Sequence, residues 1–238
     1  LNESLERVSF SPSPEVAARA DRIDAVLRRG LAAGGWLGSE LHPSLLVHAK
    51  VTTPTTGIET QLTVYRRLPD RVLVEKQGAG LGRDVCGYNG TVGWENGEVT
   101  GYHIMKDAEL SDLVTMSWLG CDPYLRERFP IRNWIGETAV DGKPAVAVVL
   151  RTLTGVGGRF YFDGDDGKLL RVEMDENLAA HVRAVRIDYS DYRKVGISSL
   201  PFRVTYNSAG IETTVTCSSA ETDVAMPDTL FDPRTDVD

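Results

Sequence analysis

The chain has 238 residues, and its 26 Lys and Arg against 34 Asp and Glu give a formal net charge of −8. Nucleic-acid binding requires a basic surface for phosphate contacts, so we expect no nucleic-acid partner. The charge also argues against attachment to an anionic membrane by charge alone. The 23 Gly and 11 Pro separate short runs of Val, Thr and Ile, which is typical of many short strands joined by turns.

Residues 1–12 carry no periodic pattern, and we interpret them as a mobile arm. A helix is predicted to follow, because Ser13 is a favourable N-cap, Pro14 suits the first helical position and Glu15 suits the positive end of the helix dipole. Gly34-Gly35 ends this helix. Its apolar residues recur on one face, at Val16, Ala20, Ile23, Leu27 and Leu31.

Residues 45–104 show the two-residue period of half-buried strands, beginning with the alternation of apolar and polar residues over 45–51. Turn signals separate the runs, and Asn89-Gly90 is the strongest of them as a hairpin signal. Since antiparallel strands can be joined by short turns, we predict a meander of about six strands here.

Residues 106–128 interrupt this pattern, and we predict a helical plug insertion. The apolar residues with helical spacing, together with one serine, are Leu110, Leu113, Val114, Ser117 and Trp118. The two-residue period returns at Ile131, and about six more strands are expected before Cys217. No linker or shift in composition divides the chain, so residues 1–238 are predicted to form a single domain.

A sheet of about eleven or twelve strands must curl to protect its edges and its apolar face. The expected fold class is mainly β with a few helices (α+β), as a curled antiparallel sheet or half-open β-barrel whose concave face the helices plug. Such a sheet leaves interior space that side chains alone do not fill. Residues 145–150 are apolar on both faces of their strand, which fits either a cavity wall or a strand covered by a helix.

The sequence contains no convincing motif for chemistry. Its three cysteines, Cys86, Cys121 and Cys217, include no C-x-x-C pair and no Cys/His cluster, so we expect no metal site. A disulfide such as Cys86–Cys217 stays open. The four histidines lack helical metal spacing, and the glycines of 78–82 lack the helix and lysine of a phosphate loop. We therefore predict no catalytic residues, no metal and no cofactor.

Five short segments then follow one another in a characteristic order: 65–71 (YRRLPDR), 87–94 (GYNGTVGW), 160–163 (FYFD), 188–193 (DYSDYR) and 228–233 (DTLFDP). Their order resembles the bacterial outer-membrane lipoprotein-sorting proteins, the LolA/LolB-like family, over most of the chain. The resemblance implies a half-open barrel of about eleven antiparallel strands with helices over an apolar concave face. It also implies the binding of acyl chains or other hydrophobic ligands by a periplasmic or otherwise exported protein.

These observations favour a soluble carrier or receptor that buries a hydrophobic ligand, such as a lipoprotein acyl chain or another lipid, in an apolar cavity. The helix around Leu110 is expected to act as a lid. The predicted ligand-binding residues are Trp94, Leu110, Leu113, Val114, Trp118, Val148, Phe160 and Phe162. We expect a monomer without a transmembrane segment.

An enzyme of cyclase or isomerase type, acting on a hydrophobic substrate in the same cavity, stays open as the alternative. It requires a titratable group inside the cavity, and the candidates are His48, Glu75, His103 and Glu173. A third interpretation is a partner-binding module, for which a filled core and an exposed apolar patch are expected. Whether the interior of the sheet is empty, filled by side chains or occupied by a ligand distinguishes these three interpretations.

Overall fold

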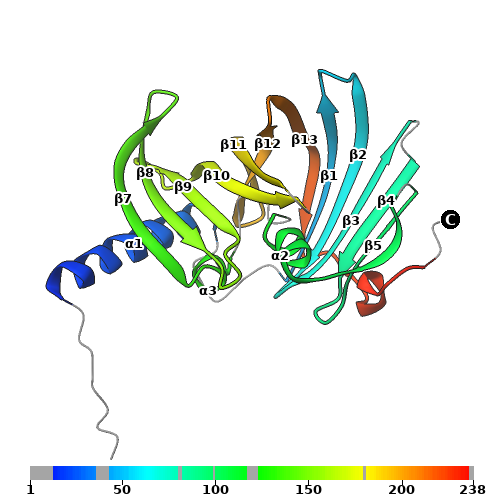
Figure 1. Ribbon diagram of the computed structural model, residues 1–238, viewed down its shortest axis with the longest axis horizontal. Helices are drawn as coiled ribbons and strands as arrows, with labels where there is room; N and C mark the ends of the chain where they lie inside the picture. The colour runs from blue at the N-terminus through cyan, green and yellow to red at the C-terminus, as the bar shows by residue number, and fades with distance from the viewer. Residues whose placement is uncertain are drawn as a thin grey trace, which may run out of the picture.

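The computed structural model describes residues 13–35, 43–79, 82–98, 100–116, 123–178 and 181–235. One curled antiparallel sheet of 13 strands dominates it, with a few helices on the sheet (Figure 1). The predicted fold class is therefore confirmed, with 13 strands in place of the smaller number expected. The predicted arm at 1–12 lies outside the described residues.

The strands of the first half are β1 (Ser44–Thr53), β2 (Ile58–Arg67), β3 (Arg71–Gly78), β4 (Gly82–Tyr88), β5 (Gly93–Gly97) and β6 (Gly101–Met105). Those of the second half are β7 (Ile131–Val140), β8 (Lys143–Arg151), β9 (Gly157–Asp163), β10 (Leu169–Leu178), β11 (His181–Val195), β12 (Ser198–Ser208) and β13 (Ile211–Thr222). The helices are α1 (Pro14–Ala33), α2 (Asp107–Met116), α3 (Leu125–Arg128) and the 3₁₀ turn η1 (Asp228–Phe231).

The order of strands across the sheet is β6-β5-β4-β3-β2-β1-β13-β12-β11-β10-β9-β8-β7. The first strand, β1, therefore lies at the centre of the sheet, and the next strands run outward to the edge strand β6. The chain then crosses to the opposite edge at β7 and returns strand by strand until β13 pairs with β1. The segment that makes this crossing contains α2 and α3. Within the described residues the edge strands β6 and β7 do not pair with each other, so the sheet remains an open curl.

Local sequence explains the turns that hold the meander. Between β4 and β5, the side-chain Oδ1 of Asn89 accepts hydrogen bonds from the backbone N–H groups of Thr91 and Val92, at 3.0 and 2.9 Å. Between β7 and β8, Asp141 and Gly142 both adopt positive φ angles, 50° and 81°. Such angles match a two-residue hairpin turn to the twist of its strands.

The helix α1 begins as its sequence predicts. The side chain of Ser13 caps it by accepting from the N–H of Val16 at 3.4 Å, and Pro14 occupies the first turn. The helix ends at Gly34. Its buried residues, which all join the main core, are Ile23, Val26, Leu27 and Leu31. Three residues of the predicted apolar face, Ile23, Leu27 and Leu31, are thus buried, whereas Val16 and Ala20 near the start of the helix are exposed.

The two faces of the sheet carry different partners. We call the side that contacts α1, α2 and α3 the inner face, and the other side the outer face. On the inner face, Phe162 lies against Gly30 of α1, and Phe160 packs edge-on against Phe129 after α3, with 5.2 Å between ring centroids. On the outer face, η1 covers the first half of the sheet with the side chain of Phe231 fully buried.

Two further expectations concern a disulfide bond and a transmembrane segment. Cys86 and Cys217 are free thiols, so the disulfide that was left open between them is not formed. Cys121 lies outside the described residues. Within the described part of the chain, no helix combines the length and the apolar character needed to span a bilayer.

Candidate functional site

An apolar groove of about 370 Å³ lies on the inner face of the sheet, where α2 covers it from one side. Strands from both halves of the chain contribute, because β1 and β13 are neighbours at the centre of the sheet. The lining residues are Val51, Thr60, Leu62, Val64, Val74, Lys76, Cys86, Leu113, Tyr206, Thr213 and Val215. Aliphatic side chains form most of this wall.

Strand register explains why these side chains share one wall. Val64 on β2 pairs directly with Val74 on β3, and Val74 pairs with Cys86 on β4. Directly paired residues project from the same face of a sheet and contact one another across the strands. Val64, Val74 and Cys86 each belong to the alternating set of their strand that faces inward, a set that also includes Lys76 on β3. The alternation that predicts the strands therefore also builds the groove.

The helix α2 sits close to the sheet because residue 93 has no side chain. A Cβ atom placed on Gly93 of β5 would lie 2.5 Å from Cδ1 of Leu110. Leu110 therefore packs directly over the backbone of β5, and Leu113, one turn further along α2, reaches the groove. This arrangement gives α2 the position that the sequence predicts for a lid.

The thiol and the phenol of the groove wall are neutral at physiological pH. Burial raises the pKa of the Cys86 thiol to about 11 and that of the Tyr206 phenol to about 12. In both cases removal from water disfavours the charged form. The wall is therefore apolar in its chemistry as well as in its composition, with a single ammonium group among its lining residues.

A buried arginine lies next to this wall and was not among the predicted site residues. Arg66 of β2 is 1% exposed and occupies the same face as Leu62 and Val64. Its positive charge acts on Tyr206, where it opposes the effect of burial on the phenol pKa. The two-residue period already places Arg66 on the inner face, but nothing in the sequence indicates that a guanidinium is buried there.

The predicted ligand-binding residues divide into several groups in the structure. Only Leu113 lines the groove, while Leu110 seats α2 on the sheet and Val114 is half-buried on the same helix. Trp118 lies outside the described residues. The remaining four, Trp94, Val148, Phe160 and Phe162, are brought to other parts of the molecule.

Val148, Phe160 and Phe162 belong to a part of the inner face that is already filled. All three are buried and join the core cluster that includes Leu27 of α1 and Phe129. Val148 was predicted as cavity wall because residues 145–150 are apolar on both faces of their strand. The packing of α1 and Phe129 on this part of the face agrees with the alternative in which a helix covers the strand.

Trp94 lies on the outer face, on the side of the sheet away from α2. It is fully buried in a separate cluster with Leu73, Val85 and Phe231. Its side chain packs over Gly87, where a Cβ atom would lie 3.0 Å from the indole ring. A ligand in the inner groove does not reach Trp94, so this residue supports the fold.

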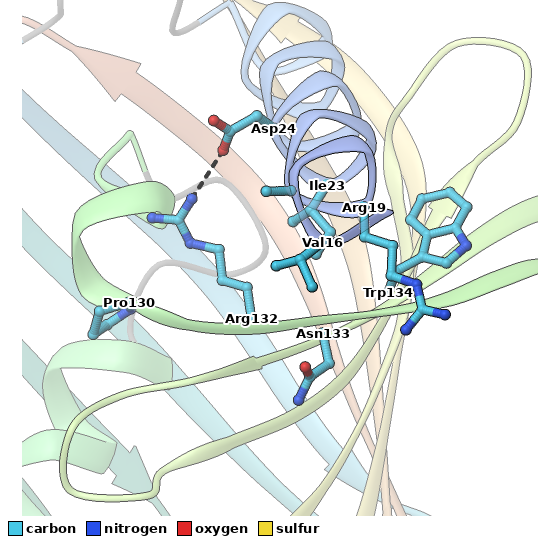
Figure 2. Close-up of a pocket in the computed structure, with 9 residues that line it drawn as sticks. Val16, Arg19, Ile23, Asp24, Pro130, Arg132, Asn133 and Trp134 are labelled. Carbon is cyan, nitrogen blue, oxygen red and sulfur yellow. Dashed lines mark hydrogen bonds and ion pairs between the residues drawn. The ribbon is translucent and has the colours of Figure 1, made fainter. Parts of the chain in front are cut away.

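A second hollow, of about 410 Å³, lies between α1 and the edge strand β7 (Figure 2). Its walls mix apolar Val16 and Ile23 with the charged side chains of Arg19, Asp24 and Arg132. An ion pair between Arg132 and Asp24, 2.9 Å long, closes one side of it. This hollow is more polar than the groove and suits an apolar ligand less well.

The structure also separates the four titratable candidates of the enzyme alternative. His48, Glu75 and Glu173 occupy strand positions on the outer face, and Glu75 forms ion pairs there with Arg83 and Arg234. His103 alone among the four projects from the inner face, where its Nε2 contacts Glu109 at 2.8 Å. Hydrogen bonding to Glu109 raises the pKa of His103. The four residues therefore do not form one acid–base site.

Solved structures of other proteins share this architecture. A LolA superfamily protein from Nitrosomonas europaea superposes with a TM-score of 0.62 and 10% identity, over 88% of this chain and 97% of that one. The fold is LolA-like. A domain from Vibrio parahaemolyticus described as outer membrane lipoprotein-sorting gives a TM-score of 0.59 and 7% identity, over 90% and 96% of the two chains.

A DUF1329 family protein from Desulfovibrio piger also superposes on this chain, with a TM-score of 0.61 and 12% identity over 88% of this chain and 97% of that one. No protein-family model and no curated protein matches the sequence. The resemblance predicted from the order of short segments is thus confirmed at the level of the fold.

Proposed function

We propose that this protein carries a hydrophobic ligand, the acyl chain of a lipid or lipoprotein, in the groove beneath α2. The observation that carries the proposal is the groove itself: an aliphatic wall on the inner face, with Leu113 of a lid helix completing it. Its volume of about 370 Å³ falls within the range of about 300–1,000 Å³ that is usual for small-molecule sites. The LolA-like fold, shared with a lipoprotein-sorting domain, supports the same ligand class.

Binding in such a groove is driven by removal of apolar surface from water. Each buried methylene contributes about 0.8 kcal/mol, which is roughly a fourfold change in affinity. These gains must exceed the cost of association before binding is measurable. A chain that enters beneath α2 displaces or lifts the helix, so α2 controls both entry and release.

An exported, periplasmic location and a monomeric state belong to the same proposal. A carrier of lipoprotein acyl chains works between membranes, and a single copy of the chain supplies every residue of the groove wall. Light scattering of the purified protein tests the monomer. Fractionation of the cells in which the protein occurs naturally tests the location.

The central experiment measures a fluorescent fatty acid binding to delipidated protein, together with mass spectrometry of solvent extracts from the protein as purified. Saturable binding that competes with unlabelled acyl chains is expected. Absence of both co-purified lipid and probe binding would overturn the proposal.

Two matched variants locate the binding site. Leu113→Asp places a carboxylate in the groove, so it should weaken probe binding by at least about 10-fold, because burial of an unpaired charge is costly. Val16→Asp places the same charge at a 55%-exposed position on the wall of the hollow between α1 and β7. It should leave binding unchanged. Loss of binding in Val16→Asp, with Leu113→Asp unaffected, would move the site to that hollow.

A further inference from the structure

Three side chains that can ligate a metal converge beside the first turn of α2. Glu95 comes from β5, His103 from β6 and Glu109 from α2, and one ligand atom from each lies within 4.8 Å of the other two. The closest pair is Nε2 of His103 and Oε1 of Glu109, 2.8 Å apart. Thr100 donates a hydrogen bond from its Oγ1 to Oε1 of Glu95 at 3.0 Å, which orients that carboxylate.

The fold brings these residues together from positions that show no metal motif in the sequence. Glu95 and His103 are direct partners in the β5–β6 pairing, so both project from the inner face. The helix α2 begins two residues after β6 ends, and its first turn places Glu109 over that pair. The spacing of His103 and Glu109 is therefore set by a strand-to-helix turn and differs from the spacing of metal ligands within one helix.

The chemistry of the set matches a first-row divalent cation. One imidazole nitrogen and two carboxylate oxygens favour Zn²⁺ and its neighbours over Mg²⁺ or Ca²⁺, which prefer oxygen ligands alone. With neutral His103, the two carboxylates supply two negative charges for a 2+ ion. Zinc bonds of about 2.0–2.2 Å require ligand atoms about 3.3–3.6 Å apart in tetrahedral geometry.

The side chains can reach that geometry by small movements. Those of His103 and Glu109 are 38% and 47% exposed, so neither is locked by packing. We propose that Glu95, His103 and Glu109 form a binding site for a divalent transition metal, with Zn²⁺ as its representative, and that the bound ion ties α2 to the β5–β6 hairpin. Water completes the coordination.

The consequence concerns the helix that covers the groove. Glu109 precedes Leu110, which seats α2 on Gly93, and Leu113, which lines the groove. A metal held by Glu109 and the hairpin fixes the first turn of α2 to the sheet edge. The site is distinct from the acyl-chain groove, and its existence does not depend on any lipid ligand.

The test is a titration of untagged, EDTA-treated and dialysed full chain with Zn²⁺ in a calorimeter, with Co²⁺ absorbance as a report on coordination geometry. We expect one equivalent to bind with micromolar or tighter affinity. His103→Gln and Glu109→Gln should each weaken binding by at least about 10-fold, because each removes one of three protein ligands.

Matched controls remove the same chemical groups elsewhere. Glu137→Gln removes an exposed carboxylate from β7, and His48→Gln removes an imidazole from the outer face of β1. Both should bind Zn²⁺ as the natural sequence does, and circular dichroism verifies that all variants are folded. Absence of micromolar binding, or equal affinity in the folded His103→Gln variant, would overturn the proposal whatever the outcome of the fatty-acid experiments.

Discussion

Trp94 on β5 donates its indole N–H to the backbone carbonyl of Phe231, 137 residues further along the chain, with 3.0 Å between nitrogen and oxygen. Both side chains are fully buried. The bond fastens the C-terminal segment to the outer face of the sheet, behind the strands whose inner face forms the groove. Stability of the groove wall thus depends on a contact made on its far side.

The role of Trp94 can be separated from ligand binding by one substitution. Trp94→Phe removes the indole donor and leaves the carbonyl of Phe231 buried without it, which should lower the free energy of unfolding by about 1–3 kcal/mol. Urea denaturation measures the loss. Affinity for a fluorescent fatty acid should stay unchanged, since the indole faces away from the groove. A loss of affinity at unchanged stability would place Trp94 in the ligand site after all.

The close contact between Gly93 and Leu110 gives a prediction about the lid. In Gly93→Ala the new methyl would lie 2.5 Å from Cδ1 of Leu110, so either that side chain or α2 must move. We expect faster release of bound fatty acid, measured by stopped-flow displacement. The overpacking should also destabilise the protein by about 1–3 kcal/mol.

The double variant Gly93→Ala/Leu110→Ala supplies the control for this contact. Truncation of Leu110 makes room for the new methyl group. Leu110→Ala should therefore lower the free energy of unfolding less in the Gly93→Ala background than in the natural sequence. Strictly additive effects on stability and release would show that the two residues do not meet.

Cys86 reports on the groove through its reactivity. The thiolate is the reactive form, and burial raises the pKa of the Cys86 thiol to about 11, so only about one thiol in a thousand is ionised at pH 8. Alkylation of a variant that retains Cys86 alone should therefore be slow at pH 8. Its rate should rise about tenfold per pH unit up to pH 10, which iodoacetamide labelling followed by mass spectrometry measures.

Cys217 is the matched thiol for this measurement. Burial also raises its pKa to about 11, but it is not among the residues that line the groove. Bound fatty acid should protect Cys86 and leave the labelling of a Cys217-only variant unchanged. Equal protection of both thiols would point to a general tightening of the sheet instead of occupancy of the groove.

Much of the sheet could be predicted from local patterns, because strand period, turn residues and helix caps act over a few positions. Ser13 capped the expected helix, and Asn89 closed the expected hairpin. The same alternation indicates that Trp94 and Glu95 project from opposite faces. It does not indicate which face η1 covers, because that depends on the contact with Phe231.

The candidate site was less predictable, since it depends on which parts of the inner face the helices fill. Phe160 and Phe162 were predicted as cavity wall, yet α1 packs on Phe162 through Gly30, more than a hundred residues away in sequence, and Phe129 packs on Phe160. Likewise, His103 gains Glu95 through strand register and Glu109 through the turn into α2. Each of these juxtapositions is tertiary, and no short window of sequence contains it.

A substitution of Asp24 tests how α1 is held against the part of the inner face that contains Phe160 and Phe162. Its two carboxylate oxygens accept hydrogen bonds from Arg126 of α3 and Arg132 of β7, both at 2.9 Å, so one side chain joins three elements (Figure 2 shows the pair with Arg132). The groups are about one-quarter to one-third exposed. Solvent therefore screens the ion pairs, and Asp24→Asn should cost about 1–2 kcal/mol in urea denaturation.

Asp21→Asn, one turn earlier on an exposed position of α1, is the control and should change stability by less than about 0.5 kcal/mol. The cost at Asp24 should shrink in high salt, because partly exposed ion pairs are screened. Groove binding should persist in Asp24→Asn, since Asp24 lines the other hollow. If both variants were equally stable, the ion pairs of Asp24 would not hold α1 in place. The apolar packing of Ile23 and Leu27 would then be enough to hold α1 on the sheet.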